Sequence, residues 1–313
     1  MFDQNVKLSL HSNFKIGGLA KYFIETENIE KLINAIIQWQ QFNQDDFFIL
    51  GGGTNILFND EEFKGLIIKP NLNFIKKEKD YIRAGASVSI TQLLNYSITK
   101  NLTGLEWAAG LPGTIGGAIR GNAGAFSGEI KNNIVEVISL DTESKKIKII
   151  KRKNKDCGFN YRSSIFKNEN NKEIIIEAVL DLRKGDKKKM KEITEQNIAY
   201  RQKNQPLEYP SIGSIFKNVP IDSIRKTVSS AKLSSMPIKN DPFPLIPVAY
   251  LISEANLKGI SCGGAIISPK HPNFIVNALN ATANDVKNLI KLVKDRVKNK
   301  FGINLEEEIV YLK

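Results

Sequence analysis

The sequence has only two cysteines, Cys157 and Cys262, and neither belongs to a CxxC pair. Disulfide frameworks and cysteine-based zinc sites need several cysteines at short spacings, so this scarcity argues against both. Two isolated thiols are typical of a protein from a reducing cytoplasm. We therefore expect two packed thiols and no metal site.

The sequence also lacks long apolar runs. No stretch of about 18 apolar residues occurs, although a transmembrane helix needs one. The first residues, MFDQNVKLSLHSNFKIGG, have no basic start followed by an apolar segment, so they do not predict a signal peptide. With 313 residues, 42% hydrophobic and 25% charged, the composition is that of a globular protein of two or three domains. We expect a cytoplasmic protein with no membrane partner.

Acidic residues are fewer than basic ones. The sequence has 33 Asp and Glu and 45 Lys and Arg, which gives a formal net charge of +12. Such an excess can bind nucleic acid. The lysines are scattered, however, and the run KIKIIKRKNK (146–155) alternates with isoleucine, as a strand with one solvated face does. No RNA-binding aromatic motif or zinc finger accompanies them. The charge therefore favours anionic small molecules as partners and not nucleic acid.

Helices and strands are mixed along the whole chain, which predicts an α+β protein. Thr26 is predicted to cap a helix that carries Ile29, Leu32, Ile33, Ile36 and Ile37 on one stripe. The segment FFIL (47–50) runs into GGGTN (51–55) and then ILF, which predicts strand, glycine turn and strand. The segment 134–150, IVEVISLDTESKKIKII, predicts a hairpin about a DTES turn.

The last third begins near residue 185. Thr282 and Asp285 predict a capping box, and Gly302 is predicted to end the helix that follows it. The apolar stripe of this helix is Val286, Leu289, Ile290, Val293 and Val297. The terminal segment INLEEEIVYL alternates, so we expect a strand with Glu306, Glu308, Val310 and Leu312 on one face.

Glycine is concentrated in GLEWAAGLPGTIGGAIRGNAGAFSGE (104–129), with eight glycines in 26 positions. Glycine turns let backbone N–H groups point into a concavity that holds an anion. Neither this segment nor GGGTN (51–55) is followed by the Gly-Lys-Ser/Thr of a P-loop or fits a Rossmann GxGxxG. The residues alone predict a phosphate or dinucleotide held by backbone contacts, or else a run of tight turns.

Eight motifs in order carry a resemblance to a known family: FKIGG, ILGGGTN, GLEWAAGLPGTIGGAIRGNAGA, FNYRSSIF, PSIGSIFKN, LISEANLKG, GGAIISPKHPNFIVN and FGINLEEEI. From about residue 12 to 311 the chain resembles the UDP-N-acetylenolpyruvoylglucosamine reductases (MurB), flavoproteins with a vanillyl-alcohol-oxidase (PCMH) type of FAD-binding domain. The resemblance implies an FAD-binding domain over 1–184, with lobes at about 1–72 and 73–184, and a C-terminal α+β substrate-binding domain over 185–313. Only 30 residues separate Leu182 from Gly213, which implies the shorter subgroup without an extra tyrosine-bearing loop.

The activity that this resemblance implies is an NADPH-dependent reduction of an enolpyruvyl ether on FAD. The substrate would be UDP-N-acetyl-3-O-(1-carboxyvinyl)-glucosamine and the product UDP-N-acetylmuramate, a precursor of peptidoglycan. The enzyme would be a cytoplasmic monomer. The implied FAD contacts are Gly51, Gly52, Gly53, Thr54, Asn55, Gly85, Gly110, Pro112, Gly113, Thr114, Gly116, Gly117, Asn122, Ala123 and Gly124.

Reduction of a double bond next to a carboxylate needs a hydride at the β carbon, stabilisation of the developing enolate and a proton at the α carbon. The flavin supplies the hydride. The resemblance assigns the enolate to Arg162, and a guanidinium suits this role because it binds a carboxylate through two parallel hydrogen bonds and stays charged. It assigns the proton to Ser214.

Glu308 matches the third catalytic residue of the family. A carboxyl on one face with Val310 and Leu312 would be partly desolvated, which would raise its pKa. The resemblance places the substrate diphosphate on Asn218, Lys258 and His271. From the residues alone, without the resemblance, the sequence predicts that Arg162 is a surface arginine, that Ser214 is a turn residue and that Glu308 is part of a solvated edge strand.

Two other functions stay open. A flavin oxidase would use the same cofactor domain with another substrate, and it would not need the C-terminal motifs. A basic RNA- or phospholipid-binding module would be colourless, would lack redox activity and would bind with a strong dependence on salt.

Overall fold

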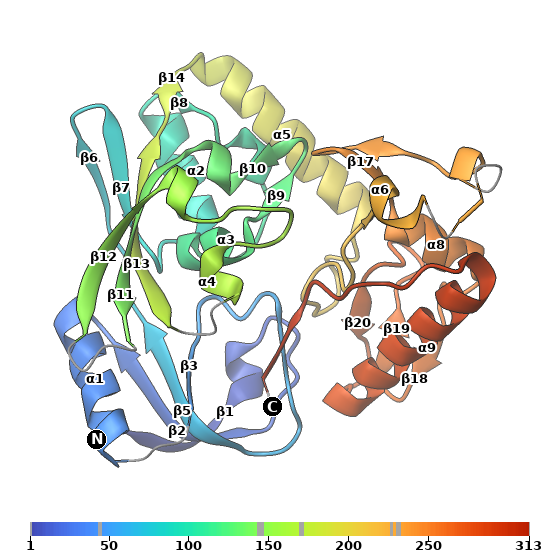
Figure 1. The fold of residues 1–313 in the computed structure, drawn as a ribbon, viewed down its shortest axis with the longest axis horizontal. Helices are drawn as coiled ribbons and strands as arrows, with labels where there is room; N and C mark the ends of the chain where they lie inside the picture. The colour runs from blue at the N-terminus through green and yellow to red at the C-terminus, as the bar shows by residue number, and fades with distance from the viewer. Residues whose placement is uncertain are drawn as a thin grey trace. The chain divides into compact units, whose positions relative to one another are not determined.

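The computed structural model describes residues 2–42, 46–142, 147–168, 172–225, 228–229 and 233–312 (Figure 1). The chain forms two compact units. The first contains Met1–Val6, Ala20–Gly52 and Lys64–Tyr200, and the second contains Lys7–Leu19, Gly53–Phe63 and Arg201–Lys313. The chain therefore passes from one unit to the other within the GGGTN turn.

The described part of the first unit holds a four-stranded sheet, a five-stranded sheet and two sheets of two strands each. Its strands are β1 (Asp3–Lys7), β2 (Leu19–Thr26), β3 (Phe47–Ile49), β5 (Phe63–Pro70), β6 (Ile75–Glu78), β7 (Tyr81–Gly85), β8 (Leu102–Thr103), β9 (Gly124–Ala125), β10 (Gly128–Glu129), β11 (Ile134–Asp141), β12 (Lys148–Lys153), β13 (Glu173–Asp181) and β14 (Arg183–Lys184). Its helices are α1 (Ile29–Phe42), α2 (Ile90–Thr99), α3 (Ile115–Gly121), α4 (Ile165–Asn168) and α5 (Lys187–Asn204), with 3-10 turns η2 (Glu106–Ala108), η3 (Ile130–Asn132) and η4 (Asn154–Asp156).

The four-stranded sheet has the order β1-β2-β5-β3, with β3 parallel to β5. Helix α1 buries Leu32, Ile36 and Trp39 in one cluster with β5. The predicted helix is confirmed, but Thr26 as its N-cap is wrong. Thr26 ends β2, and the side chain of Asn28 accepts a hydrogen bond from the N–H of Lys31 at 2.8 Å. The strand continues through Thr26, so a cap has to come from the turn after it.

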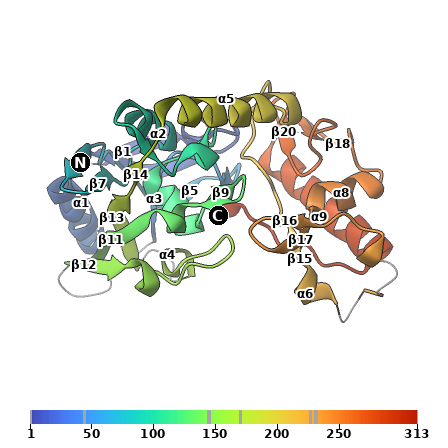
Figure 2. The same cartoon turned by 90° about the horizontal axis from the view of Figure 1, so that it is seen from above.

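The five-stranded antiparallel sheet has the order β12-β11-β13-β7-β6. The predicted pairing of β11 with β12 is confirmed by the register Leu140↔Ile149. Residues 143–146, which include the last two residues of the DTES turn, lie outside the described residues. Helices α2 and α3 lie beside this sheet (Figure 2) and share one apolar cluster with β7 and β13. This packing holds the glycine-rich helix α3 against the sheet.

The second unit is built around the long helix α9. Its elements are η1 (Leu8–His11), β4 (Ile56–Phe58), β15 (Val219–Pro220), α6 (Ile221–Ile224), β16 (Lys239–Asn240), β17 (Pro244–Ile246), α8 (Val248–Glu254), β18 (Ser261–Cys262), β19 (Ala265–Ile267), β20 (Ile275–Asn277), α9 (Ala283–Phe301) and β21 (Val310–Leu312). Strands β18, β19 and β20 form one antiparallel sheet, and β15, β17 and β16 form another.

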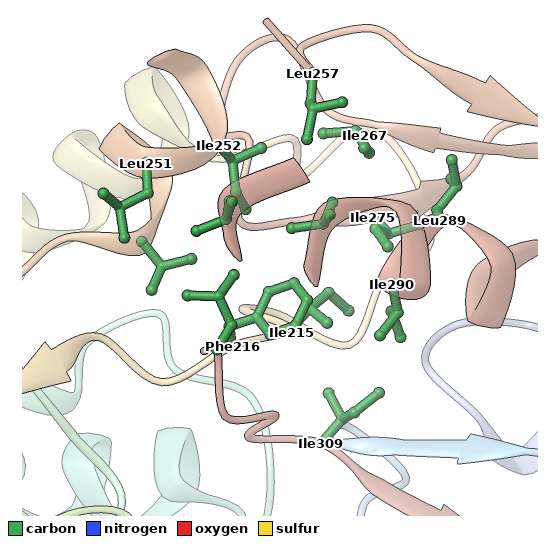
Figure 3. Packing of buried hydrophobic residues seen from close by; sticks show 14 of the residues in the cluster. Ile215, Phe216, Leu251, Ile252, Leu257, Ile267, Ile275, Leu289, Ile290 and Ile309 are labelled. Atoms are coloured by element: carbon green, nitrogen blue, oxygen red, sulfur yellow. The ribbon is translucent and has the colours of Figure 1, made fainter. Parts of the chain in front are cut away.

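The predicted caps of α9 are confirmed. The Thr282 hydroxyl accepts from the N–H of Asp285, the Asp285 carboxylate accepts from the N–H of Thr282, and Gly302 ends the helix at φ +75°. The apolar stripe of α9 is buried against α8 and the β18–β20 sheet, together with Ile215 and Phe216 (Figure 3). Burying a large aliphatic side chain contributes about 1.5–3 kcal/mol, so this cluster anchors the segment that carries Ser214.

The terminal strand is shorter than predicted. Only Val310–Leu312 form β21, which pairs in parallel with β4, and Glu307 makes one isolated bridge with Phe216. The preceding residues alternate as expected, with Leu305 and Ile309 buried. Irregular backbone precedes β21 because its neighbour over these residues is the short segment around Phe216.

Both cysteines remain thiols, and Cys157 is buried within the first unit. Burial raises the pKa of the Cys157 thiol to about 12. Within the described residues, no helix has the length and apolar content needed to cross a membrane.

Candidate active site

The GGGTN turn presents a row of unpaired backbone donors. Among the described residues, no acceptor takes a hydrogen bond from the N–H groups of residues 51–55. Gly53 has φ +63°, and a Cβ there would lie 2.0 Å from the carbonyl oxygen of His11. Only glycine fits this position, and the bend it permits leaves the five amides of the turn without an acceptor among the described residues.

The second glycine turn is mostly occupied within the protein. The amides of Ile115 and Gly116 donate to Val88 and Ala86 at 2.9 Å, and Gly117 N–H donates to Thr114 Oγ1 at 3.3 Å. The amides of Gly113 and Thr114 have no acceptor among the described residues. This turn therefore adds two backbone donors and is otherwise held in place by β7 and its neighbours.

The two turns meet within the first unit. A Cβ on Gly51 would lie 3.0 Å from Thr114 Oγ1, so the first unpaired amides of one turn lie next to those of the other. Clustered backbone N–H groups bind phosphates. Gly51, Gly52, Gly113 and Thr114 therefore fit the pyrophosphate of a dinucleotide such as FAD.

The other predicted cofactor positions have different surroundings. Gly117 is exposed, and a Cβ there would meet only Thr114 Oγ1, at 3.5 Å. Gly85 is buried, and a Cβ there would clash with the carbonyl oxygen of Leu72 at 2.0 Å. Gly85 is thus required by close packing of β7, whereas Gly117 leaves open space above the helix.

The remaining predicted cofactor positions shape the turn. Gly110 and Gly113 have φ +70° and +120°, on either side of Pro112. Gly116 packs on Ala86, where a Cβ would lie 3.1 Å from the alanine methyl. Asn122 is fully buried in the left-handed region at the end of α3, and Ala123 and Gly124 lead from it into β9.

Arg162 is held tightly in the first unit. Its Nη2 donates to the carbonyl oxygen of Gly124 at 2.7 Å, and its guanidinium lies 5.1 Å from the centre of the Tyr161 ring. The side chain is 19% exposed, and the backbone is left-handed at φ +51°. Non-glycine residues keep such a conformation only where their surroundings impose it. The guanidinium is therefore presented in one orientation.

Glu129 is a further residue at this position that the sequence did not reveal. Its side chain is 5% exposed, and Oε1 lies 4.0 Å from Arg162 Nη1. The same oxygen accepts from Asn122 Nδ2 at 3.1 Å. Only its place in FSGEI marks it in the sequence, because the contact joins residues 33 apart.

Ser214 lies on a short irregular segment of the second unit. This segment forms one bridge with Phe274 and another between Phe216 and Glu307. The Ser214 side chain is half-buried, and its hydroxyl has no hydrogen-bond partner among the described residues. The backbone of Ser214 is thus fixed on both sides while its hydroxyl is left available.

Asn273 is the second residue that the sequence did not reveal. Its side chain is 3% exposed, accepts from Phe216 N–H at 3.0 Å and donates to Phe216 C=O at 2.9 Å. An amide side chain can pair with both groups of one residue, as a neighbouring strand would. Asn273 therefore clamps the segment that carries Ser214.

Glu308 lies beside this segment in the second unit. Its N–H donates to the carbonyl oxygen of Ile215 at 2.8 Å, and its own carbonyl accepts from Asn55 Nδ2 at 3.2 Å. The side chain is half-buried. The structure thus brings the backbones of Ser214 and Glu308 onto adjoining segments, and it ties Glu308 to the end of the GGGTN turn.

Three further predicted residues lie in the second unit. Asn218 uses its Oδ1 to accept from Val248 N–H at 3.1 Å, at the start of α8. Lys258 is exposed in the turn after α8. His271 packs edge-on against Phe274 at 4.7 Å, and burial lowers its pKa from 6.5. Its Nδ1 is buried without a hydrogen-bond partner among the described residues.

The charged groups near Ser214 are largely paired. Lys217 forms an ion pair with Glu306, and its side chain is 14% exposed. Across the described parts of the chain, no three His, Cys, Asp or Glu side chains gather in a way that could hold a metal ion. The predicted residues of this unit therefore offer a hydroxyl, a carboxyl, an uncharged imidazole and the exposed ammonium of Lys258.

Comparison with known families matches both parts of the chain. Residues 20–145 match the family described as FAD binding domain. Residues 205–312 match the family described as UDP-N-acetylenolpyruvoylglucosamine reductase, C-terminal domain. The expected α+β architecture, an FAD-binding domain of the PCMH type followed by a C-terminal domain of the MurB type, is confirmed.

Curated relatives extend the match over nearly the whole chain. The UDP-N-acetylenolpyruvoylglucosamine reductase of Clostridium tetani is 37% identical over 99% of this chain and 92% of its own. That of Fervidobacterium nodosum is 36% identical over 97% of this chain and 90% of its own. The crystal structure of the reductase (MurB) from Thermus caldophilus superposes with a TM-score of 0.78 at 26% identity, covering 100% of this chain and 99% of that one. The chain belongs to the UDP-N-acetylenolpyruvoylglucosamine reductase family.

Proposed function

We propose that this chain is an NADPH-dependent flavoenzyme that reduces UDP-N-acetyl-3-O-(1-carboxyvinyl)-glucosamine to UDP-N-acetylmuramate for peptidoglycan synthesis. The observation that carries this function is the union in one chain of an FAD binding domain and the C-terminal domain of these reductases. FAD is the cofactor and NADPH the reductant. When bound, the flavin supplies the hydride-transfer chemistry.

The role of Arg162 is to bind the substrate carboxylate and to stabilise the negative charge that develops on it as the enolate forms. A guanidinium in a fixed orientation does this without reorganising during the reaction. The hydrogen bond from Arg162 to the Gly124 carbonyl at 2.7 Å supports this role.

The role of Ser214 is to donate its hydroxyl proton to the α carbon of the enolate. The hydroxyl has no partner among the described residues, so no protein hydrogen bond has to break first. Glu308, on the adjoining segment, hydrogen-bonds the developing enolate. A hydroxyl is a weak acid, but an enolate carbon is a strong base, so the transfer is feasible once the two are in contact.

The substrate diphosphate is assigned to Asn218, Lys258 and His271. The Oδ1 of Asn218 caps α8, which leaves its Nδ2 as the donor for a phosphate oxygen. The lowered pKa of His271 keeps the imidazole neutral, so it contributes one N–H donor, and Lys258 supplies the positive charge.

Several finer assignments complete the proposal. The FAD-binding part is residues 1–184, with lobes at about 1–72 and 73–184, and the substrate-binding part is residues 185–313. The enzyme acts as a cytoplasmic monomer of the shorter subgroup, with neither nucleic acid nor membrane as partner.

The function is tested by the absorbance of the purified protein. We expect a yellow protein whose colour is bleached by NADPH without oxygen and restored by adding the enolpyruvyl nucleotide. A protein that NADPH bleaches but that only oxygen reoxidises would be a flavin oxidase. A colourless protein that binds RNA or phospholipid in a salt-dependent manner would be a binding module.

The FAD contact is tested at Gly117. Because a Cβ there meets only Thr114 Oγ1 at 3.5 Å, Gly117→Val should fold yet purify without FAD, and it should melt like the parent protein stripped of FAD. Gly121→Val is the matched control, since a Cβ at Gly121 has no neighbour within 4 Å. Full yellow colour in Gly117→Val would disprove the contact.

A further inference from the structure

A buried carboxylate stands beside Arg162, and the proposed reaction does not use it. Glu129 lies on β10, and its side chain is 5% exposed. Its Oε1 accepts from Asn122 Nδ2 at 3.1 Å, and its Oε2 lies 2.7 Å from Lys131 Nζ. A carboxylate is buried at a large cost unless it is paired, so these contacts determine where the negative charge sits.

The hairpin that carries Glu129 is rigid. Strands β9 and β10 pair Glu129 with Gly124 and Gly128 with Ala125. The two residues that join them, Phe126 and Ser127, are both left-handed, with φ +48° and +63°. A Cβ on Gly128 would lie 2.2 Å from the Trp107 ring, so the hairpin backbone lies flat on this indole. Strained turn residues persist only where the surroundings hold them.

Both ends of this hairpin face the guanidinium of Arg162. Gly124 offers its carbonyl oxygen to Nη2 at 2.7 Å, and Glu129 places Oε1 4.0 Å from Nη1. The two acceptors come from paired residues of one hairpin, so they cannot move independently. Gly124 contributes a neutral hydrogen bond, whereas Glu129 contributes charge.

Glu129 lies between two cations. Its Oε2 lies 2.7 Å from Lys131 Nζ, and its Oε1 lies 4.0 Å from Arg162 Nη1. Without Glu129, the two cations would repel each other with no carboxylate between them.

We propose that Glu129 is a positioning residue that orients the Arg162 guanidinium for the carboxylate of the enolpyruvyl substrate. This inference rests on the role proposed for Arg162. The separation of 4.0 Å directs the guanidinium by charge without using its donors in a tight bidentate pair. The donors that the substrate needs are thereby kept in place.

The experiment separates the two half-reactions in Glu129→Gln, which keeps the shape and removes the charge. We expect reoxidation by the enolpyruvyl nucleotide to slow by about 10- to 100-fold, as displacement of a binding group does, while flavin reduction by NADPH stays within about two-fold. The dissociation constant of the substrate, measured by calorimetry, should rise by about 10-fold. In a protein that already carries Arg162→Lys, adding Glu129→Gln should slow reoxidation little further, because the guanidinium that binds a carboxylate through two hydrogen bonds is already lost.

The matched control is Glu173→Gln. Glu173 is also a buried carboxylate of the first unit, 8% exposed and paired with Arg152, but it touches no proposed site residue. This variant should lose stability and leave both half-reactions unchanged. If Glu129→Gln does not fold, Glu129→Asp keeps the charge and withdraws it by one methylene, and at least a three-fold loss in reoxidation is expected.

The outcomes distinguish the two proposals. Unchanged reoxidation in Glu129→Gln, with a large loss in Arg162→Lys, would overturn the positioning role alone. The positioning role would also be overturned if, in the double variant, the loss in reoxidation caused by Glu129→Gln added in full to the loss caused by Arg162→Lys. Unchanged reoxidation in Arg162→Lys would overturn the role of Arg162 itself.

Discussion

The two units hold their proposed reactive groups in different ways. In the first unit, Arg162 is fixed through its own side chain, by the carbonyl of Gly124 and the ring of Tyr161. In the second, Ser214 is fixed through its backbone, and its hydroxyl contacts no described hydrogen-bond partner. A group that binds charge needs a set direction, whereas a proton donor needs only a set position. The difference predicts which substitutions harm chemistry and which harm the fold.

The largest effect on the reaction is expected at Ser214, whose hydroxyl is proposed to donate a proton and is not expected to support the fold. Ser214→Ala removes a hydroxyl that has no hydrogen-bond partner among the described residues. Reoxidation by the enolpyruvyl nucleotide should slow by about 10²–10⁴-fold, the usual contribution of a general acid. The melting temperature and the rate of reduction by NADPH should not change. Ser211→Ala, three residues earlier, is the control. Equal losses in both half-reactions would refute the role of Ser214.

Breaking the backbone clamp should harm both fold and chemistry. Asn273→Leu leaves the N–H and C=O of Phe216 unpaired and buried. Each such group costs about 1–3 kcal/mol, so we expect a loss of about 2–6 kcal/mol in unfolding free energy and slower reoxidation. Denaturation by urea measures the first and stopped-flow absorbance the second. Asn284→Ala, exposed on α9, should change neither, and a stable Asn273→Leu would mean that the clamp is dispensable.

The β9–β10 hairpin that contacts Arg162 can be distorted by a substitution that changes no charged residue. Gly128→Ala adds a methyl carbon that would lie 2.2 Å from Cγ of the Trp107 ring. Such overpacking lowers the free energy of unfolding by about 1–3 kcal/mol. Substrate affinity should fall with stability because the hairpin supports Arg162. By contrast, Gly121→Ala at an open helix position should stabilise the protein by about 0.5–1 kcal/mol. Thermal melts and calorimetric titration of both variants test this pair.

The smallest effect is a dependence on pH that belongs to the second unit. Burial lowers the pKa of His271 from 6.5, so below this pH the unfolded chain takes up a proton that the folded chain resists. Stability should therefore fall as pH drops through this range. His271→Gln should lose less stability between pH 7.5 and 5.5 than the parent, as urea denaturation would show. An identical pH profile in the parent and in His271→Gln would mean that His271 does not cause this dependence.

Local signals in the sequence predicted the elements that depend on neighbours along the chain. The caps of α9 at Thr282 and Gly302 are an example, because a capping box and a left-handed glycine act within one turn of helix. The cap of α1 was misplaced at Thr26, since the length of β2 is set by its partners in the sheet and not by the capping preference.

The site shows the same division. The glycine turns and the proposed catalytic residues could be named from motifs and from the family resemblance. Glu129 and Asn273 could not, because their roles come from contacts across 33 and 57 positions. Nothing in a local pattern shows that a buried amide will pair with the backbone of Phe216. The supports of a reactive group are thus harder to predict than the group itself.

The parallel pairing of β21 with β4 has a consequence for folding. The nearby hydrogen bond from Asn55 Nδ2 to the Glu308 carbonyl joins residues 253 positions apart. Contacts of such long range form slowly. We therefore expect the downstream end of the GGGTN turn to be among the last parts of the second unit to become ordered as the chain folds.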